Sequence, residues 1–336
     1  MKKYNVAVVG AMGAVGQEML KTLEKRSFPV KELIPLDVLT NVSKEILFNG
    51  KTLAIKEARA GAFKDVDIAL FSAGEDASRE LAPIAVSEGC RVIDNSSTWR
   101  MDENVPLVVP EVNPEALRGN NGIIANPNCT TIQMLVALKP IHDLYTIKRI
   151  VVSTYQAVSG SGQKAINELE NQASQYARGE EITYEVYPHQ ILFNAIPHID
   201  TFMENGYSKE EMKMINETHK ILDPTIKVSP TAVRIAVFRG HSESINIETE
   251  KPINITEVRE VLRTSKGITV VDDLGQKLYP MAINCKDKYD VFVGRIRLDK
   301  SVENGLNLWV VADNLLKGAA LNAVQIAEKM VEMNLV

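Results

Sequence analysis

The chain has 336 residues, with 38 Lys and Arg against 43 Asp and Glu, and a formal net charge of −5. Hydrophobic residues make up 45% and charged residues 24%, which suits two folded domains and argues against general disorder. The slight acidic excess disfavours a nucleic-acid surface, and no apolar run reaches the roughly 18 residues of a membrane helix. Three scattered cysteines suit a reducing compartment. We therefore expect an α/β protein of the cytoplasm without nucleic-acid, membrane or metal partners.

A glycine turn follows the first predicted strand. Residues 5–9 form a β-rich run, residues 17–26 are helix-like, and Gly10-Ala11-Met12-Gly13-Ala14-Val15-Gly16 lies between them. A strand, a glycine turn and a helix in this order favour binding of a dinucleotide pyrophosphate at the helix N-terminus. The spacing is G-x-x-G-x-x-G rather than the usual G-x-G-x-x-G, so a tight βα turn without a ligand stays open. The candidate cofactor contacts in this turn are Gly10, Met12, Gly13, Ala14 and Val15.

Short strands and helices continue to alternate after this turn. Predicted strands cover 32–36, 67–71 and 91–94, with a helix over 77–88. This alternation predicts a parallel, doubly wound sheet, in which ligands bind beyond the carboxyl ends of the strands. Ser72 and Gly74 are candidate contacts on that basis. Asp37 ends the second strand, where it either contacts a ribose diol or serves as a turn residue.

Cys129 stands at the start of a predicted helix. The polar run Asn126-Pro127-Asn128-Cys129-Thr130-Thr131 precedes the apolar residues 132–138, and we expect Pro140 to close the helix. Asn and Thr are good caps, which puts Cys129 at or next to the positive end of the helix, and that favours the reactive thiolate. Cys90 and Cys285 have no such setting, and we expect them to be buried packing residues.

A thiolate beside a nicotinamide site indicates oxidation of an aldehyde through a thioester. The sulfur adds to the aldehyde, and hydride leaves for the cofactor. Proton transfer in such a reaction needs an acid/base group. His241, in the polar turn Phe238-Arg239-Gly240-His241-Ser242-Glu243, is the candidate.

The glycine turn, the cysteine segment and several further segments resemble those of a known family, the aspartate-semialdehyde dehydrogenases. The similar segments run in the family's order from residue 10 to about residue 325. Besides the glycine turn and the cysteine segment, they are Asp94-Asn95-Ser96-Ser97-Thr98-Trp99-Arg100-Met101, Val108-Val109-Pro110-Glu111-Val112-Asn113-Pro114, Tyr155-Gln156-Ala157-Val158-Ser159-Gly160-Ser161-Gly162, Gly240-His241-Ser242-Glu243, Asp290-Val291-Phe292-Val293-Gly294-Arg295-Ile296-Arg297 and Asp313-Asn314-Leu315-Leu316-Lys317-Gly318-Ala319-Ala320.

The resemblance implies a reaction and its catalytic residues. The family carries out the NADPH-dependent reductive dephosphorylation of L-4-aspartyl phosphate to L-aspartate 4-semialdehyde. This step serves lysine, diaminopimelate, threonine and methionine biosynthesis. By matching position, Cys129 is the expected nucleophile, His241 the acid/base, Gln156 the residue that orients the acyl group, and Asn128 the neighbour of the thiol.

The resemblance also implies how the substrate is held. Arg234 matches the family's carboxylate-binding arginine, and a planar guanidinium suits a carboxylate. Arg100 and Lys213 match its phosphate-binding pair, and Glu210 matches the contact to the substrate ammonium. Glu210 and Lys213 are three residues apart, so a helix places them on one face.

Arg234 and His241 are seven residues apart, an odd number that would point them to opposite faces of an unbroken strand. We expect Gly240 to break the strand and to turn His241 back towards the site. The sequence therefore predicts that the regular strand ends at or before residue 240.

Departures from the family pattern affect the expected cofactor. Met12 replaces a threonine, and aligning the segment after the second strand puts Thr40 where an arginine normally grips the 2′-phosphate of NADP. Asp37 replaces an alanine and would repel that phosphate while accepting from a free ribose hydroxyl. We expect NADP as the cofactor, with NAD as the alternative. The resemblance implies further cofactor contacts at Asn41, Ser159, Gly160 and Asn314.

We expect a Rossmann-type dinucleotide-binding domain over 1–128 and 315–336, and an α+β catalytic and dimerisation domain over 129–314. The predicted strands of the second half are 150–155, 233–238, 244–247 and 291–298, and the helices are 163–177, 209–222, 255–264 and 315–333. The last helix should return to the first domain, as in the family. Besides the substrate and inorganic phosphate, the expected partner is a second copy of the chain, in a homodimer or homotetramer.

The cysteine motif distinguishes this chain from related enzymes on the same fold. Asn128 disfavours N-acetyl-glutamyl-phosphate reductase, whose motif is Asn-Pro-Gly-Cys, and the Ser-Cys-Thr-Thr-Asn motif of glyceraldehyde-3-phosphate dehydrogenase is absent. Two alternatives stay open: a CoA-ester reductase similar to malonyl-CoA reductase, and a non-catalytic nucleotide-binding regulator.

Overall fold

The computed structural model describes residues 2–336. The chain forms two compact units. Unit 1 runs up to Asn128 and includes Ala319–Val336, and unit 2 is Cys129–Gly318. Within the described part of the chain, no helix combines the length and the apolar character needed to cross a bilayer.

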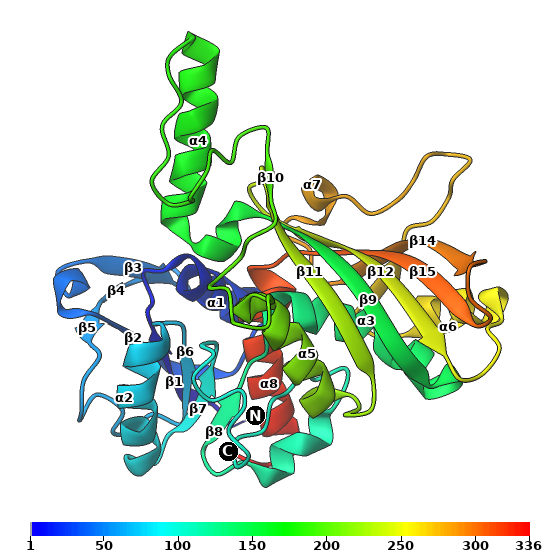
Figure 1. The fold of residues 1–336 in the computed structure, drawn as a ribbon. Coiled ribbons are helices and arrows are strands. Elements are labelled where there is room, and N and C mark those ends of the chain that lie inside the picture. The colour runs from blue at the N-terminus through cyan, green and yellow to red at the C-terminus, as the bar shows by residue number, and fades with distance from the viewer. Residues whose placement is uncertain (1) are drawn as a thin grey trace. The chain divides into compact units, whose positions relative to one another are not determined.

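Unit 1 is built on a six-stranded parallel sheet in the order β5-β2-β1-β6-β7-β8 (Figure 1). Its strands are β1 (Tyr4–Val9), β2 (Val30–Asp37), β5 (Lys56–Glu57), β6 (Ile68–Phe71), β7 (Arg91–Asp94) and β8 (Ile123–Ala125). A separate hairpin joins β3 (Glu45–Phe48) to β4 (Lys51–Ala54), and short 3-10 turns cover η1 (Leu39–Asn41) and η2 (Pro114–Gly119). The doubly wound sheet predicted from the alternating elements is confirmed.

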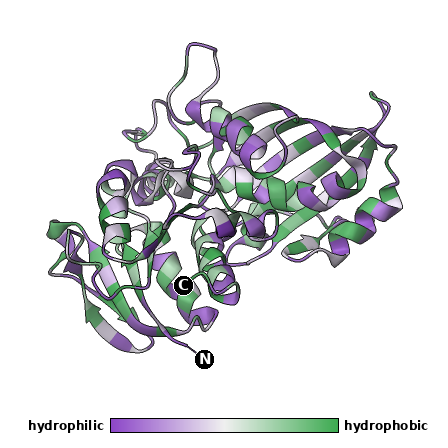
Figure 2. Cartoon of the chain, turned by 90° about the horizontal axis from the view of Figure 1, so that it is seen from below, coloured by the Kyte–Doolittle hydropathy of each residue, from purple (hydrophilic) through white to green (hydrophobic). Residues whose placement is uncertain are grey.

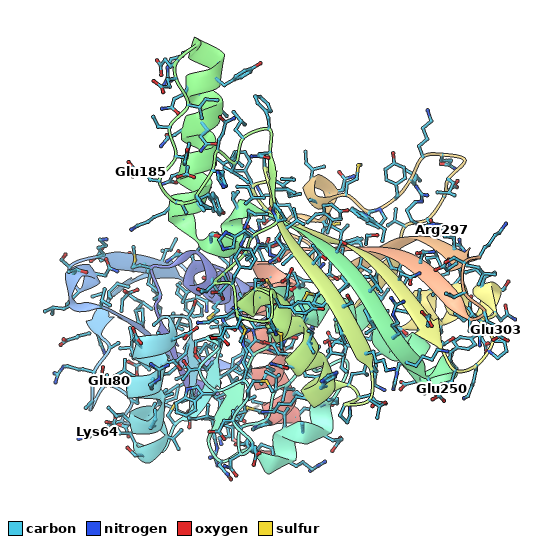
Figure 3. The ribbon with its side chains drawn as sticks, in the orientation of Figure 1. Lys64, Glu80, Glu185, Glu250, Arg297 and Glu303 are labelled. Atoms are coloured by element: carbon cyan, nitrogen blue, oxygen red, sulfur yellow. The ribbon has the colours of Figure 1, made fainter. Side chains whose placement is uncertain are left out.

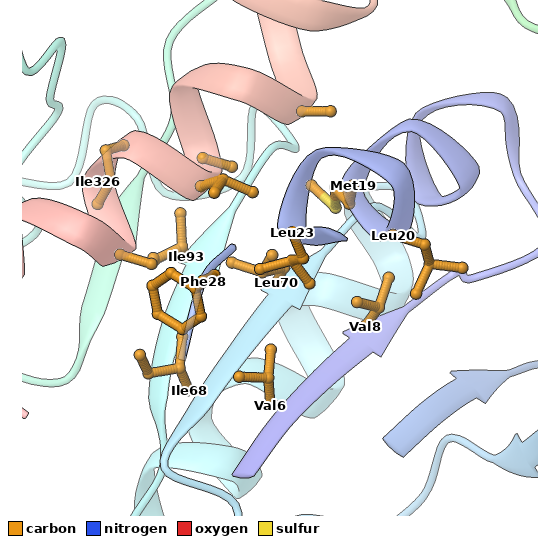
Figure 4. Close-up of a cluster of buried hydrophobic side chains, with 14 of the residues drawn as sticks. Val6, Val8, Met19, Leu20, Leu23, Phe28, Ile68, Leu70, Ile93 and Ile326 are labelled. Atoms are coloured by element: carbon orange, nitrogen blue, oxygen red, sulfur yellow. The ribbon is translucent and has the colours of Figure 1, made fainter. Parts of the chain in front are cut away.

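Helices cover both faces of this sheet. They are α1 (Ala14–Lys25), α2 (Glu75–Ser87) and α8 (Leu321–Glu332). Because side chains alternate along a strand, Val6 and Val8 of β1 pack with α1 and α8, as Figure 4 shows. Ala7 and Val9 face the opposite side, where α2 packs. The predicted return of the last helix is confirmed, except that it begins with a π-helical turn, η4 (Leu316–Ala320), before α8.

Unit 2 is built on a seven-stranded mixed sheet in the order β10-β11-β9-β12-β15-β14-β13. Its strands are β9 (Ile147–Gln156), β10 (Ala195–Ile196), β11 (Lys227–Ile235), β12 (His241–Thr249), β13 (Ile268–Val270), β14 (Val291–Asp299) and β15 (Gly305–Ala312). Hydrophilic and hydrophobic residues alternate along several of its strands in Figure 2, as expected for a sheet with one face buried. Charged side chains such as Arg297 of β14 point away from the core (Figure 3).

The helices of unit 2 are α3 (Cys129–Tyr145), α4 (Gln163–Arg178), α5 (Lys209–Ile221), α6 (Ile255–Thr264) and the short α7 (Ala282–Cys285), with a 3-10 turn at η3 (Val158–Ser161). Three of them, α4, α5 and α6, agree closely with their predicted ranges, while α3 differs from its prediction and α7 was not predicted. The expectation that Pro140 closes α3 is wrong, because the helix continues to Tyr145. Proline removes one backbone hydrogen bond, and buried Ile141 and Tyr145 offset that loss by packing.

Candidate active site

Cys129 is the first residue of α3, and its side chain is partly exposed. The unpaired N–H groups of a helix N-terminus stabilise negative charge there, as on a thiolate. Gly318 of η4 lies against it: a Cβ added at Gly318 would stand only 2.7 Å from the Cys129 Cβ. The glycine therefore lets the backbone of η4 approach the thiol.

The other two cysteines are buried, as predicted. Cys90 and Cys285 each expose 1% of their surface. Burial raises the pKa of the Cys90 thiol, and it raises the pKa of Cys285 to about 12. Neither thiol has the exposure of Cys129 or its position at a helix N-terminus.

Arg234, Gln156 and His241 lie at the ends of three neighbouring strands. Arg234 of β11 pairs in register with Gln156 of β9, and the next strand, β12, begins at His241. All three side chains are almost completely buried. The sheet therefore brings together three residues that are far apart in the chain.

The Ala157 peptide group holds two of these side chains. Its carbonyl oxygen accepts from Arg234 Nη1 at 2.7 Å, and its N–H donates to His241 Nδ1 at 3.0 Å. Because Nδ1 accepts this bond, the neutral imidazole carries its proton on Nε2. We call this arrangement of Ala157, Arg234 and His241 the Ala157 clamp.

His241 offers its second nitrogen to the site. Its Nε2 makes no hydrogen bond within residues 2–336, although the ring is fully buried. Burial, with a smaller contribution from the Arg234 charge, lowers the pKa of His241 well below its ordinary range. Gly160 borders both groups: a Cβ there would meet Arg234 Nη1 at 3.0 Å and His241 Nε2 at 3.3 Å. The glycine thus leaves space in front of a neutral N–H donor.

A sharp turn precedes His241. β11 ends at Ile235 and Gly240 has a φ of +96°, so the prediction that the strand ends by residue 240 is confirmed. The predicted strand limits 233–238 are wrong, since the strand starts at Lys227 and stops three residues earlier. Asn314 Oδ1 accepts from the Gly240 N–H at 2.9 Å, and the Asn314 amide donates to Ser159 Oγ at 3.0 Å. These bonds fix the turn that orients the imidazole.

Gln156 connects to a charged cluster on α5. Its amide Nε2 donates to Glu210 Oε1 at 3.0 Å, and Thr154 Oγ1 donates to its Oε1 at 3.0 Å. Lys213 Nζ lies 3.2 Å from Glu210 Oε2 and 2.8 Å from an Asp200 carboxylate oxygen. The predicted common helix face of Glu210 and Lys213 is confirmed.

The glycine turn of unit 1 has the shape that a pyrophosphate requires. A Cβ at Gly16 would lie 2.1 Å from the Gly10 carbonyl oxygen, and one at Gly10 would lie 2.4 Å from the Ser72 oxygen. Gly13 caps α1 without a side-chain hydrogen bond, and the first turn carries no acidic residue. The N–H groups of residues such as Ala14 and Val15 therefore remain at a helix end suited to an anion. These residues fit a dinucleotide.

Asp37 closes the turn beside this glycine loop. Its carboxylate accepts from the backbone N–H groups of Met12 and Val38 and from the Asn41 amide, each at 2.8 Å. Both interpretations of Asp37 are thus compatible with the structure, since the residue organises the turn and also places a negative charge beside the glycine loop. Thr40 lies exposed in the same 3-10 turn.

The remaining predicted residues occupy both units. Arg100 follows β7 in unit 1, is largely buried, and donates to the backbone oxygens of Ser96 at 3.0 Å and Asn95 at 2.8 Å. Asn128 is buried at the end of the same unit. Ser72 follows β6 and Gly74 caps α2, so both stand at the carboxyl edge of the parallel sheet.

Sequence reasoning missed several residues that shape this site. Gln133 of α3 donates to the His241 carbonyl oxygen, and Gly318 packs on Cys129. In unit 1, Asn322 of α8 binds Asn126 at 2.6 Å and so fixes the segment that leads to Cys129. The sequence did offer a signal for Gln133, because a polar side chain stands within an otherwise apolar helix, four residues after the cysteine. The Asn322 contact spans 196 residues and leaves no local pattern.

Comparisons with known proteins agree with this architecture. Residues 5–120 match the family model of the semialdehyde dehydrogenase NAD binding domain, and residues 138–317 match that of the semialdehyde dehydrogenase dimerisation domain. The fold and site thus define a two-domain dehydrogenase of the semialdehyde class.

Individual relatives narrow the class. The chain is 56% identical over 338 residues to the aspartate-semialdehyde dehydrogenase of Aquifex aeolicus, covering 99% of both chains, and 52% identical over 341 residues to that of Bacillus subtilis, also covering 99% of both. The crystal structure of aspartate semialdehyde dehydrogenase II from Vibrio cholerae, complexed with ASA, superposes with a TM-score of 0.96 at 49% identity and covers 99% of each chain. The chain belongs to the aspartate-semialdehyde dehydrogenase family of oxidoreductases.

Proposed function

We propose that this protein catalyses the reversible reductive dephosphorylation of L-4-aspartyl phosphate to L-aspartate 4-semialdehyde. The observation that carries the proposal is the arrangement inside unit 2. A cysteine at a helix N-terminus shares that unit with the Ala157 clamp, which holds the Arg234 guanidinium next to a neutral imidazole. The substrate is inferred from the family, because the relatives named above are aspartate-semialdehyde dehydrogenases.

The chemistry begins at sulfur. The Cys129 thiolate attacks the acyl carbon of aspartyl phosphate, the C–O bond to phosphate breaks, and a thioester and inorganic phosphate result. The glycine turn would hold a nicotinamide dinucleotide, which would supply the hydride for reduction of this thioester. His241 donates a hydrogen bond from Nε2 to the oxygen on which negative charge develops, and it exchanges the proton there as the hemithioacetal forms and collapses. Gln156 orients the acyl group, with Asn128 beside the thiol.

The substrate's charges match the charged groups named above. Arg234 takes the α-carboxylate, since its guanidinium is already oriented by the Ala157 carbonyl. Glu210 takes the α-ammonium, and Lys213 and Arg100 take the phosphate. In the structure Lys213 pairs with Glu210 and Asp200, so substrate binding exchanges these partners for the ammonium and phosphate.

The cofactor is proposed to be NADP(H), with NAD(H) accepted. Family membership favours NADP, whereas the Asp37 carboxylate beside the glycine loop disfavours a 2′-phosphate. The glycine turn would hold the pyrophosphate through Gly10, Met12, Gly13, Ala14 and Val15. Asp37, Thr40, Asn41, Ser72 and Gly74 would border the rest of the dinucleotide in unit 1, and Ser159, Gly160 and Asn314 would do so in unit 2.

The proposed working form is a homodimer or homotetramer in the cytoplasm. A dimerisation domain matches residues 138–317, and no two cysteines within residues 2–336 form a disulfide, which suits a reducing compartment. We assign the dinucleotide-binding role to residues 1–128 and 315–336, and the catalytic, substrate-binding and dimerisation roles to 129–314.

One assay tests the function. L-aspartate semialdehyde is oxidised with NADP or NAD in the presence of inorganic phosphate, with wild type and Cys129→Ser. Wild type should require phosphate, and the variant should lose about 10³-fold or more in kcat because serine is a far weaker nucleophile. Cys90→Ser is the matched control and should keep its activity. A requirement for coenzyme A in place of phosphate, or full activity of Cys129→Ser, would overturn the proposal.

A further inference from the structure

A buried carboxyl group lies close to the site without a role in the reaction above. Glu243 of β12 is fully buried, two residues after His241 and on the same side of the strand. Neither of its carboxyl oxygens has a hydrogen-bond partner within residues 2–336. An ionised carboxylate in such a place costs several kcal/mol of desolvation free energy, so the group needs another explanation.

The residues around Glu243 carry no compensating positive charge. By register it stands opposite Thr154 of β9 and Val310 of β15, and from α3 the Gln133 side chain interacts with it. The titratable groups that flank this cluster are His241 on the same strand and Cys129, one turn before Gln133. Burial raises the pKa of Glu243 well above its ordinary range, and the interaction with Gln133 only partly opposes that rise.

The side chain of Gln133 also has an oxygen without a hydrogen-bond partner among the described residues. It is fully buried, its Nε2 donates to the His241 carbonyl oxygen at 3.4 Å, and its Oε1 has no partner within the described chain. The cluster thus contains three orphaned acceptors, Gln133 Oε1 and both carboxyl oxygens of Glu243, and within residues 2–336 it lacks a donor to Gln133 Oε1. A single proton on Glu243 supplies that donor.

We propose that Glu243 is a neutral carboxylic acid that donates its proton to Gln133 Oε1. This bond fixes the Gln133 amide so that its Nε2 holds the His241 carbonyl group. Gln133 lies one turn after Cys129 on α3, so Glu243 joins the helix that carries the nucleophile to the strand that carries the imidazole. Glu243 is a positioning residue, and its effect on turnover, unlike its protonation, rests on the proposed function.

Infrared difference spectroscopy tests the protonation directly. The spectrum of wild type minus Glu243→Gln at pH 7 should show the loss of a carbonyl band of a protonated carboxylic acid in a dry environment. Glu328→Gln is the matched control, because Glu328 is ion-paired with Arg26 at 2.6 Å and should show the loss of an ionised carboxylate band instead. An ionised band for Glu243 at pH 7 would overturn the proposal, whatever the enzyme's substrate.

Kinetics test the positioning. Glu243→Gln keeps a neutral donor of the same shape, so kcat should stay within about threefold of wild type. Glu243→Leu removes the donor, and kcat should fall about tenfold, equal to about 1.4 kcal/mol, with little change in KM because no substrate contact is lost. Equal losses in both variants, or a loss confined to KM, would contradict the role. If Glu243→Leu does not fold, Gln133→Leu provides the same test from the other side.

Discussion

At the level of single residues, the arrangement around His241 depends on the Ala157 peptide as much as on side chains. An N–H that donates to Nδ1 makes protonation of the ring unfavourable, since the imidazolium would present a second donor to it. The neutral ring is also the state that burial favours. The clamp therefore selects a hydrogen-bond donor at Nε2 and keeps it beside the guanidinium that is proposed to bind the substrate carboxylate.

Gly160→Ala tests this space directly. The added methyl group would meet Arg234 Nη1 at 3.0 Å and the imidazole at 3.3 Å, so both side chains must shift by a few tenths of an ångström. We expect kcat/KM for L-aspartate semialdehyde to fall about 10- to 100-fold, because small displacements at a reacting centre are costly. Gly275→Ala is the control, since its methyl group makes an ordinary contact at 3.4 Å. Unchanged kinetics for Gly160→Ala would show that the space is not used.

At the level of elements, α3 and η4 form the setting of the nucleophile. α3 presents its first residue, Cys129, while the π-helical turn η4 brings Gly318 against that residue. π-Helical turns inside or beside α-helices commonly occur at functional positions. Two backbone segments from opposite ends of unit 2 in the sequence therefore define the position of one sulfur atom.

Gly318→Ala should damage activity more than stability. A methyl group 2.7 Å from the Cys129 Cβ forces η4 and the start of α3 apart, which moves the sulfur relative to the substrate. We expect a loss of about 10²-fold in kcat with a decrease of about 1–3 kcal/mol in the free energy of unfolding. Gly119→Ala, where a Cβ meets nothing within 4 Å, should be neutral. Wild-type rates of Cys129 alkylation and turnover in Gly318→Ala would refute this.

The sequence predicted those features that depend on neighbouring residues, and it did not predict those that depend on how helices pack on the sheet. The glycine turn, the helix start at Cys129 and the break at Gly240 all follow from residues adjacent in the chain. The pairing of Gln133 with Glu243 depends on α3 crossing β12, which no short motif encodes. The prediction that Pro140 ends α3 was wrong because the sequence shows the backbone hydrogen bond that proline removes, but does not show the tertiary packing that offsets this loss.

At the level of the whole molecule, two buried groups give stability an opposed pH dependence. The pKa of His241 is lowered in the folded state, so the unfolded chain alone gains a proton there as pH falls below about 6.5, and stability falls with it. The pKa of Glu243 is raised in the folded state, so the unfolded chain alone loses a proton there above about pH 4.3, and stability falls as pH rises towards the folded pKa.

Urea unfolding of wild type, Glu243→Gln and His241→Gln at fixed protein concentration separates these contributions. Relative to wild type, Glu243→Gln should gain up to about 1.4 kcal/mol of unfolding free energy per pH unit as pH rises above about 4.3, because the amide cannot ionise. His241→Gln should gain at the same maximum rate as pH falls below about 6.5. Differences that stay flat with pH, in either variant, would contradict the corresponding burial argument.

The packing of α8 on one face of the unit 1 sheet has a consequence for folding while the chain is being synthesised. The ribosome makes β1, β6 and β7 early, yet the helix that shields one face of them emerges only after all of unit 2 has been translated. Until then only α1, of the two helices that pack there, covers that face of the nascent sheet, which includes Val6, Val8 and Leu70. Unit 2 can mature around its own sheet meanwhile, so the thiol-bearing helix is in place before the nucleotide-binding unit is finished.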